Sequence, residues 1–243
     1  MKKIVYILMT CFIVVSCDKN PETPTIPMET MDISFKNYLL ENFDINKDGV
    51  ISVEEAALVK EINCSGRSIQ SLDGIQYFTN LDFLDCSHNS LHEIDVSHNT
   101  KLRTLICDNN QIQALDVSTN LTLELLSCKV DYGSSGLKTI KINPELKILN
   151  ISGHEISSLD FSENKYLKEI YCSGDQMITL DVSNSVLDSL DCRGRELVFL
   201  NMEGCTTLKS FNCAYTGNQD FCTQLLKSTY VVSHTCYLLQ SQW

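Results

Sequence analysis

The chain is short of positive charge. Its 243 residues hold 19 Lys and Arg against 31 Asp and Glu, which gives a formal net charge of −12 at pH 7. Nucleic-acid binding rests on cationic faces that neutralise phosphates, and a negative surface is likewise repelled by anionic lipid headgroups. We therefore expect no nucleic-acid partner.

The sequence also lacks the short motifs that accompany common enzyme chemistries. No glycine-rich phosphate loop precedes a helix, and no serine stands in a Gly-x-Ser-x-Gly turn. His92 and Glu93 begin like a zinc-protease motif, but the next histidine, His98, falls outside the required spacing. The acid pair Asp188 and Asp191 is expected to be solvated. We therefore expect no catalysis.

No uncharged run is long enough to span a bilayer, which takes roughly 20 apolar residues. Two lysines instead precede a charge-free run over residues 4–15, which is typical of a secretory signal peptide. The end of this run, Val14-Val15-Ser16-Cys17, resembles the lipobox of bacterial lipoproteins. This resemblance implies that residues 1–16 are removed, and that lipid on Cys17 anchors an exported protein to the outer membrane, at the cell surface. An ordinary signal peptide with an incidental cysteine is the alternative.

Proline is scarce and unevenly placed. Three of the four prolines lie in residues 18–30, a segment without an apolar period. We expect residues 17–30 to be a solvated tether that begins at the lipidated cysteine. Residues 31–243 are then enough for one sizeable folded domain.

A repeat of about 21 residues fills the middle of the chain. Residues 81–101 (LDFLDCSHNSLHEIDVSHNTK) and residues 102–122 (LRTLICDNNQIQALDVSTNLT) share one pattern. Its opening leucine recurs at spacings of 21, 21, 23, 21, 20 and 21 residues, at Leu81, Leu102, Leu123, Leu146, Leu167, Leu187 and Leu208. Apolar residues that alternate in such short segments indicate strands with one buried face. Stacking these strands in register would build a continuous core that no single repeat can form.

The pattern LxxLxCxxNxLxxLDVS resembles the leucine-rich-repeat superfamily, and most of all cysteine-bearing surface lipoproteins of the Bacteroides type. Residues 71–81 (SLDGIQYFTNL) also resemble the repeats of internalins. The resemblance implies a mostly β, right-handed solenoid of about eight coils over residues 62–213, with a concave face that binds a ligand. We expect residues 214–243 to form a C-terminal cap.

The repeat also explains most of the twelve cysteines. One column of strand positions holds Cys64, Cys86, Cys107, Cys128, Cys172, Cys192 and Cys213. Neighbouring side chains in such a column point the same way, which is poor geometry for a disulfide, so we expect free, buried thiols. A bridge between Cys222 and Cys236 in the C-terminal cap is left open.

A turn asparagine follows the strand at Asn89 and Asn110. Asparagine side chains can satisfy turn backbone groups that no strand ladder reaches. The equivalent positions in later coils hold Asp131, His154, Asp175 and Arg195. We therefore expect an asparagine ladder to end after two rungs.

Residues 44–55 (DINKDGVISVEE) match an EF-hand calcium loop. Gly49 stands where the loop turns sharply, and the expected oxygen ligands are Asp44, Asn46, Asp48, Val50 through its carbonyl, Ser52 and Glu55. The flanking segments indicate helices, so residues 31–61 are expected to form an EF-hand-like helix-loop-helix cap. We expect weak, structural Ca²⁺ binding; an acidic turn without an ion is the alternative.

The outward positions of the repeated strands hold apolar residues in the central coils. The predicted ligand-binding residues are Phe83, Ile106, Leu125, Ile148 and Tyr171. Exposed apolar clusters rimmed by charge often mark interaction sites, although a sheet also tolerates scattered apolar residues. We expect a monomeric binding module for a protein or glycan ligand. The alternative is a scaffold subunit of a surface complex.

Overall fold

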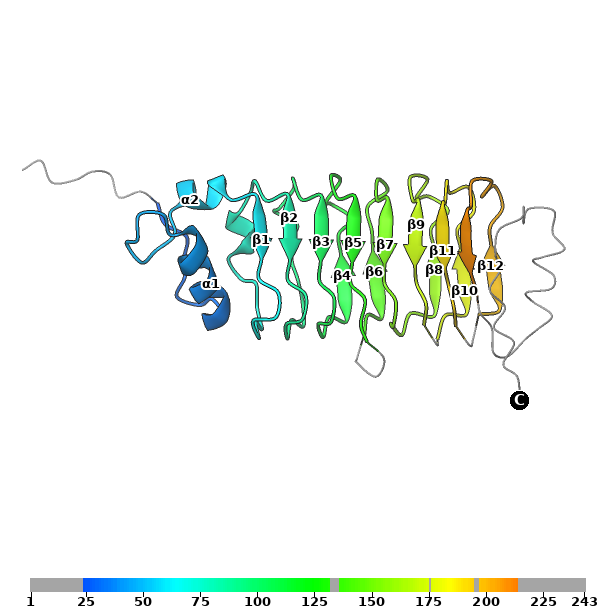
Figure 1. Ribbon diagram of the computed structural model, residues 1–243, viewed down its shortest axis with the longest axis horizontal. Helices are drawn as coiled ribbons and strands as arrows, with labels where there is room; N and C mark the ends of the chain where they lie inside the picture. Colours follow the sequence, from blue (N-terminus) through cyan, green and yellow to red (C-terminus); the bar gives the residue numbers. More distant parts are fainter. Residues whose placement is uncertain (1–23, 132–135, 175, 195–196, 214–243) are drawn as a thin grey trace, which may run out of the picture.

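The computed structural model describes residues 24–131, 136–174, 176–194 and 197–213. The chain winds into a stack of coils, with short strands lying side by side along one long body (Figure 1). The expected signal peptide over residues 1–16, the expected lipidation site at Cys17 and the expected cap over residues 214–243 lie outside the described residues. No helix within the described ranges has the length and apolar character needed to cross a bilayer.

One wall of the body is a parallel sheet of eight strands. In spatial order these are β1 (Glu61–Asn63), β2 (Phe83–Asp85), β3 (Thr104–Ile106), β5 (Leu125–Ser127), β7 (Ile148–Asn150), β9 (Glu169–Tyr171), β11 (Ser189–Asp191) and β13 (Ser210–Asn212). At about 4.8 Å per strand the sheet is about 35 Å long. The prediction of a mostly β solenoid with about eight coils is confirmed.

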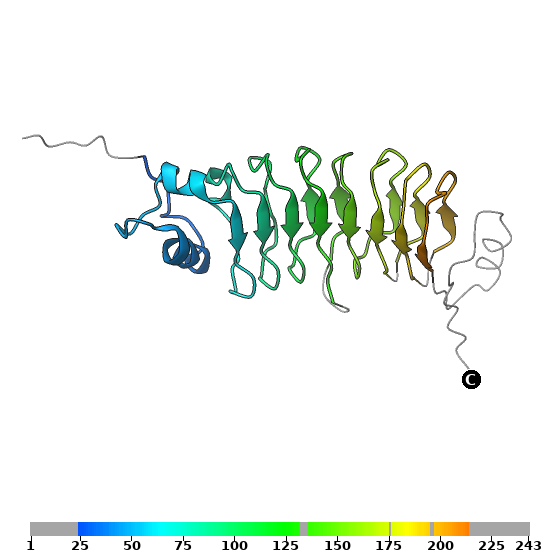
Figure 2. The ribbon, with the colours of Figure 1, turned by 45° about the horizontal axis from the view of Figure 1, so that its top comes forward.

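The second wall carries shorter sheets. A pair of parallel strands joins β4 (Ala114–Asp116) and β6 (Thr139–Lys141), and a parallel sheet of three joins β8 (Ser158–Asp160), β10 (Thr179–Asp181) and β12 (Phe199–Asn201). Where both walls are built from strands, the spacing between neighbouring coils is similar on the two walls. The body accordingly bends little in the two views, and the predicted concave face corresponds to the outer face of the eight-stranded sheet (Figures 1 and 2).

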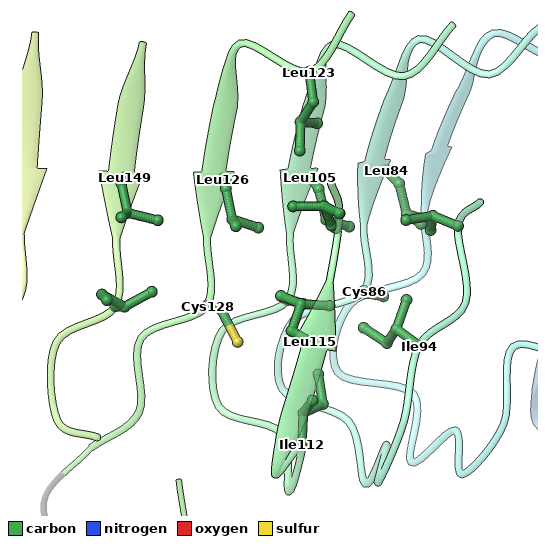
Figure 3. Packing of buried hydrophobic residues seen from close by; sticks show 14 of the residues in the cluster. Leu84, Cys86, Ile94, Leu105, Ile112, Leu115, Leu123, Leu126, Cys128 and Leu149 are labelled. Atoms are coloured by element: carbon green, nitrogen blue, oxygen red, sulfur yellow. The ribbon is translucent and has the colours of Figure 1, made fainter. Parts of the chain in front are cut away.

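The core lies between the two walls. The central residues of neighbouring strands, Leu84, Leu105, Leu126 and Leu149, are fully buried and point from the sheet toward the second wall (Figure 3). Full burial of one such side chain contributes about 1.5–3 kcal/mol relative to leaving it in water. Each coil contributes one such side chain, and the neighbouring coils help to bury it. Each coil therefore depends on its neighbours for this stabilisation.

Two helices cover the β1 end of the stack (Figures 1 and 2). They are α1 (Ile33–Phe43) and α2 (Val53–Leu58), and a 3₁₀ turn, η1 (Ile75–Tyr77), follows in the first coil. The side chain of Asp32 caps α1 by accepting hydrogen bonds from Ser34 and Phe35. The hydroxyl of Tyr38 accepts a hydrogen bond of 3.1 Å from the backbone N–H of Asn63. The helical segment is thereby fixed to the edge strand β1.

The segment expected to be a solvated tether differs from that expectation in its described part, residues 24–30. Ile26 and Met28 are buried in the same core as the helices. The N–H of Ile26 donates to the carbonyl of Ile51 at 2.9 Å, and Val53 donates to the carbonyl of Pro24 at 2.8 Å. These isolated apolar residues between prolines show no period, so sequence alone did not reveal that the segment packs on the fold.

Candidate functional site

The predicted ligand-binding residues come together on the outer face of the eight-stranded sheet. Five consecutive strands each contribute one of them: Phe83 from β2, Ile106 from β3, Leu125 from β5, Ile148 from β7 and Tyr171 from β9. Leu125 and Ile148 are directly paired in register. All five side chains are partly exposed, because they alternate with the buried strand centres. We call these five residues the apolar stripe.

A column of charged residues borders the apolar stripe where the chain enters each strand. Arg103 lies 2.9 Å from Glu124, and Glu124 lies 2.8 Å from Lys147. Hydrogen bonds from Lys147 and Arg103 lower the pKa of Glu124. Near β13, Lys209 pairs with Asp188 at 2.7 Å. Sequence reasoning missed this column because it considered only the two outward positions within each strand.

Tyr171 lies at the β9 end of the stripe. Its hydroxyl donates a hydrogen bond of 3.0 Å to Glu169 on the same strand. Burial and the neighbouring carboxylate of Glu169 raise the pKa of Tyr171, against a lowering contribution from Ser189. The ring is therefore neutral at physiological pH and offers an apolar face with a polar edge, a combination that protein interfaces favour.

The cysteine column lies on the opposite side of the same strands, inside the core. All seven members are buried, at Cys64, Cys86, Cys107, Cys128, Cys172, Cys192 and Cys213. The first five of these are free thiols. Burial raises the pKa of Cys64 and of Cys172 to about 12. A thiol reacts through its thiolate, so these side chains are inert packing groups, as the sequence predicted.

In the described part of the column, Cys128 differs from Cys64, Cys107 and Cys172 because its pKa is lowered. Hydrogen bonding with the Cys107 thiol is the largest cause, and His154 adds to it, so that the pKa of Cys128 falls to about 6 despite burial. Cys107 carries the opposite shift, upward. With 2% of Cys128 exposed, no reagent or substrate reaches the thiol in the folded protein.

The asparagine ladder forms as predicted in the early coils. The amide nitrogen of Asn89 donates to the Cys64 carbonyl at 2.9 Å, and its oxygen accepts from the Ile69 N–H at 3.0 Å. Asn110 repeats both bonds one coil later, with Cys86 and Leu91, at 3.0 Å each. Both side chains are buried, so they satisfy turn groups that water does not reach.

The asparagines of this column end after two rungs, as predicted, but a different side chain makes the equivalent contacts in the fifth coil. His154 takes the same position two coils later, with its Nε2 against the Cys128 carbonyl and its Nδ1 accepting from the Leu137 N–H at 2.9 Å. An imidazole ring can place a donor and an acceptor much as an amide does. A search restricted to asparagine did not recognise this substitution.

A second asparagine column lines the turns of the second wall. The side-chain nitrogens of Asn99 and Asn120 donate to carbonyls of the preceding coil at 2.9 and 2.8 Å, and Asn143 and Asn164 do the same at 3.2 and 3.0 Å. All four residues are buried. The repeated Asn of the LDVSxN segment was the sequence signal for this column, which ties each coil to the next.

The calcium-type loop lies between α1 and α2, with its carboxylates engaged by the loop backbone. The two carboxylate oxygens of Asp44 accept from Asp48 and Gly49 at 3.2 and 2.9 Å. Gly49 has φ +86°, a left-handed conformation that glycine adopts without a steric penalty. The side chain of Asn46 donates to Asp48 at 2.8 Å. The chain thus forms a tight turn with its oxygens drawn inward.

Glu55 closes the loop as part of a capping box with Ser52 at the start of α2. Burial raises the pKa of Glu55, but hydrogen bonds from Ser52, Ile45 and Asn46 more than offset this, so the pKa lies below its usual value. Within the described residues, no three His, Cys, Asp or Glu side chains converge as a metal site. The oxygen-rich donor set suits Ca²⁺, yet an ion would have to replace several of these hydrogen bonds.

Comparison with known proteins gives internalins as relatives in fold. No family model matches the chain. Internalin J of Listeria monocytogenes serotype 4b (strain F2365) is 31% identical over 69 residues, which are 28% of this chain and 8% of that protein. The solved functional domain of InlJ from Listeria monocytogenes, described as including a cysteine ladder, has 25% identity and a TM-score of 0.61, over 77% of this chain and 51% of that one.

Another internalin of Listeria monocytogenes, inlF, has 15% identity and a TM-score of 0.47, over 81% of this chain and 80% of that one. The present chain spans about half of the InlJ domain and less than a tenth of the curated relative. The similarity to InlJ confirms the predicted resemblance to internalins at the level of the leucine-rich-repeat fold.

Proposed function

We propose that the chain is an exported, non-catalytic binding module that holds a protein ligand on the apolar stripe. The observation that carries the proposal is that five consecutive strands each present one partly exposed apolar side chain on the same face, with Phe83, Leu125 and Ile148 in one register row and Ile106 and Tyr171 in the row beside it. Such a surface is long and bordered by charge, which suits a partner that buries an apolar surface of its own. The fold shared with internalins supports a binding role for the repeats.

The same proposal places the protein at the cell surface, held to the outer membrane by lipid on Cys17. Support comes from the charge-free run over residues 4–15 and the cysteine that follows it. Residues 18–23 then separate the lipid from the first described residues. Metabolic labelling with a fatty-acid probe tests the anchor: label is expected on the wild-type protein and not on a Cys17→Ser variant. Labelling of both would place the lipid elsewhere.

The binding face is tested by replacing Ile106, Leu125 and Tyr171 together with aspartate. The three changes put charge into the stripe without touching the buried strand centres, so folding is expected to persist while ligand capture from host extracts is lost. Val198→Asp is the matched control, because Val198 is an exposed apolar residue beside β12 of the second wall. Undiminished capture by the triple variant would assign binding to another face.

Two alternative functions, glycan binding and a scaffold role, can each be tested by a separate experiment. A glycan array probed with the same proteins would favour a carbohydrate ligand if the wild type binds and the triple variant does not. A scaffold role predicts a cross-linked partner of fixed stoichiometry on intact cells. The charged column next to the stripe is already paired within the chain, and this favours an apolar contact over a purely electrostatic one.

We also propose that residues 44–55 bind Ca²⁺ weakly and that the ion rigidifies the cap. Asp44, Asn46, Asp48, Ser52 and Glu55 would supply side-chain oxygens, and Val50 its carbonyl. Support comes from the left-handed Gly49 and from the pairing of residues 24–26 with Ile51 and Val53. That pairing, which forms one antiparallel bridge between Thr25 and Ser52, places residues 24–26 beside the loop.

The ion site is tested by following the melting temperature during a Ca²⁺ titration from micromolar to several millimolar. The wild type is expected to gain stability because the ion binds only the folded loop. Asp48→Asn should abolish the gain, whereas Asp73→Asn, outside the loop, should retain it. An unchanged melting temperature for the wild type at several millimolar would exclude a structural ion.

A further inference from the structure

One carboxylate lies in the same register row as part of the apolar stripe. Glu169 on β9 is paired in register with Ile148 on β7 and with Ser189 on β11, and its side chain is partly exposed. Leu125 is the next member of this row beyond Ile148. At about 4.8 Å between strands, Glu169 lies about 5 Å from Ile148 and about 10 Å from Leu125. A ligand that covers the stripe as far as Tyr171 therefore also covers this carboxylate.

The hydrogen bonds of Glu169 engage one of its two carboxylate oxygens. The Tyr171 hydroxyl donates to Oε2 at 3.0 Å, and Ser189 hydrogen-bonds the same hydroxyl. Oε1 accepts no hydrogen bond from the described residues, and no cationic side chain among them forms an ion pair with Glu169. Tyr171 thus positions the carboxylate at the sheet surface and leaves one oxygen to solvent or to a ligand.

Other carboxylates beside the stripe are satisfied within the chain. Ion pairs join Glu124 to Lys147 at 2.8 Å, Asp188 to Lys209 at 2.7 Å and Asp191 to Arg193 at 2.8 Å. At the β2 end, Asp85 has no such cation but accepts hydrogen bonds of 3.0 and 2.6 Å from the backbone and the hydroxyl of Ser87. Glu169 differs from all of these, because its one partner in the described residues is a neutral phenol.

We propose that the protein ligand of the apolar stripe carries a basic side chain, arginine in preference to lysine, that pairs with Glu169 beside the apolar contact. This inference rests on the proposed function of the stripe. A partner that covered Glu169 with apolar groups alone would strip water from a carboxylate and leave it unpaired, which is costly. A guanidinium can donate to Oε1 and also lie against the ring of Tyr171. The apolar stripe then supplies affinity, and Glu169 selects ligands that carry the charge.

The probe for this test is a random peptide library displayed on phage. It is selected on the full exported chain, kept free of lipid by Cys17→Ser. Enriched peptides are expected to hold an arginine or lysine within about three residues of an apolar pair, because about 10 Å corresponds to three residues of extended chain. Selection on Glu169→Gln should keep the apolar pair and lose the basic residue. Asp85→Asn is the matched control and should keep both.

A binding cycle with one selected peptide tests direct contact. Replacing the arginine of the peptide by glutamine is expected to weaken binding about tenfold or more, and Glu169→Gln should do the same, because each leaves one charge of the pair without its partner. The two changes together should cost little more than either alone, since they remove the same interaction. The change in the peptide uses the wild-type protein, so this readout holds even if Glu169→Gln folds poorly.

Leu125→Asp separates this inference from the proposed function. It should abolish enrichment of the selected peptides, because it puts charge into the apolar contact. Peptides that depend on Leu125 but show no basic preference, or losses that add in the binding cycle, would overturn the pairing with Glu169 and leave the binding face in place. Equal enrichment of the same peptides on Leu125→Asp and on the wild type would overturn both.

Discussion

At the scale of single residues, buried side chains that bridge coils do more than fill space. The amide of Asn110 satisfies two carbonyls and one N–H that lie on two successive coils. A buried polar group without a partner costs roughly 1–3 kcal/mol. One asparagine therefore affects both the turn that holds it and the turn before it.

Asn110→Ala is expected to lower the free energy of unfolding by about 2–4 kcal/mol, because it leaves several buried backbone groups unpaired. Gln111→Ala is the control: its side chain is exposed, and a surface change of this kind is expected to stay within about 0.5 kcal/mol. Urea denaturation followed by circular dichroism measures both. A cost for Asn110→Ala no larger than that of the control would show that water satisfies these groups.

The sequence predicted columns in which one residue type recurs, but it did not predict positions where different residue types make the same contacts. The cysteine column was found because one residue type recurs in register, and the structure places it in the core as expected. The sequence analysis did not recognise His154 as the equivalent of Asn110, because the two side chains share hydrogen-bonding groups but are different residue types. The charged column that includes Glu124 was missed because it lies one position before the strands that carried the prediction.

At the scale of elements, the segment over residues 24–30 behaves as part of the cap. Its backbone pairs with residues 51–53, and Ile26 and Met28 are buried with α1. Proline content favoured an extended chain, and the structure pairs Thr25 with Ser52 in one antiparallel bridge. The sequence could not show that its two apolar side chains have a place to pack, since that place is built by helices later in the chain.

Ile26→Ala is expected to destabilise the protein by about 2–4 kcal/mol, through lost burial and the cavity left behind. Glu29→Ala, an exposed change in the same segment, should have little effect. Chemical denaturation of chains that begin at Asp18 compares the two. If Ile26→Ala matched Glu29→Ala in stability, residues 24–30 would be a solvated tether after all.

At the scale of the whole molecule, stability is distributed along one axis. Each coil contacts the coil before and the coil after it, and the pairing of strands proceeds without interruption from β1 to β13. In such a stack, end units open more readily than central ones, because they are held from one side. The regular leucine spacing was sufficient to predict this architecture, since any other fold would leave the recurring apolar faces in water.

The buried thiols allow this gradient to be measured. Alkylation at pH 8 in moderate urea, mapped by mass spectrometry, should modify Cys205, which follows β12, before Cys107 in the centre. Both thiols are buried, so modification reports opening of the coil that holds each one. Simultaneous modification of both would mean that the whole stack opens as one cooperative unit. The β1 end, covered by α1, should resemble the centre.

The fourth coil shows how the body tolerates change. The leucine that opens it and the leucine that opens the next coil are 23 residues apart, not 21, yet β5 and β7 still pair in register, with Leu125 opposite Ile148. The extra length of the fourth coil therefore does not change the strand register on the face that we propose binds a ligand. Insertions or deletions in this part of the fourth coil could therefore accumulate during evolution without changing the specificity of the proposed binding face. For the same reason, a tag or a small domain could be inserted there by design.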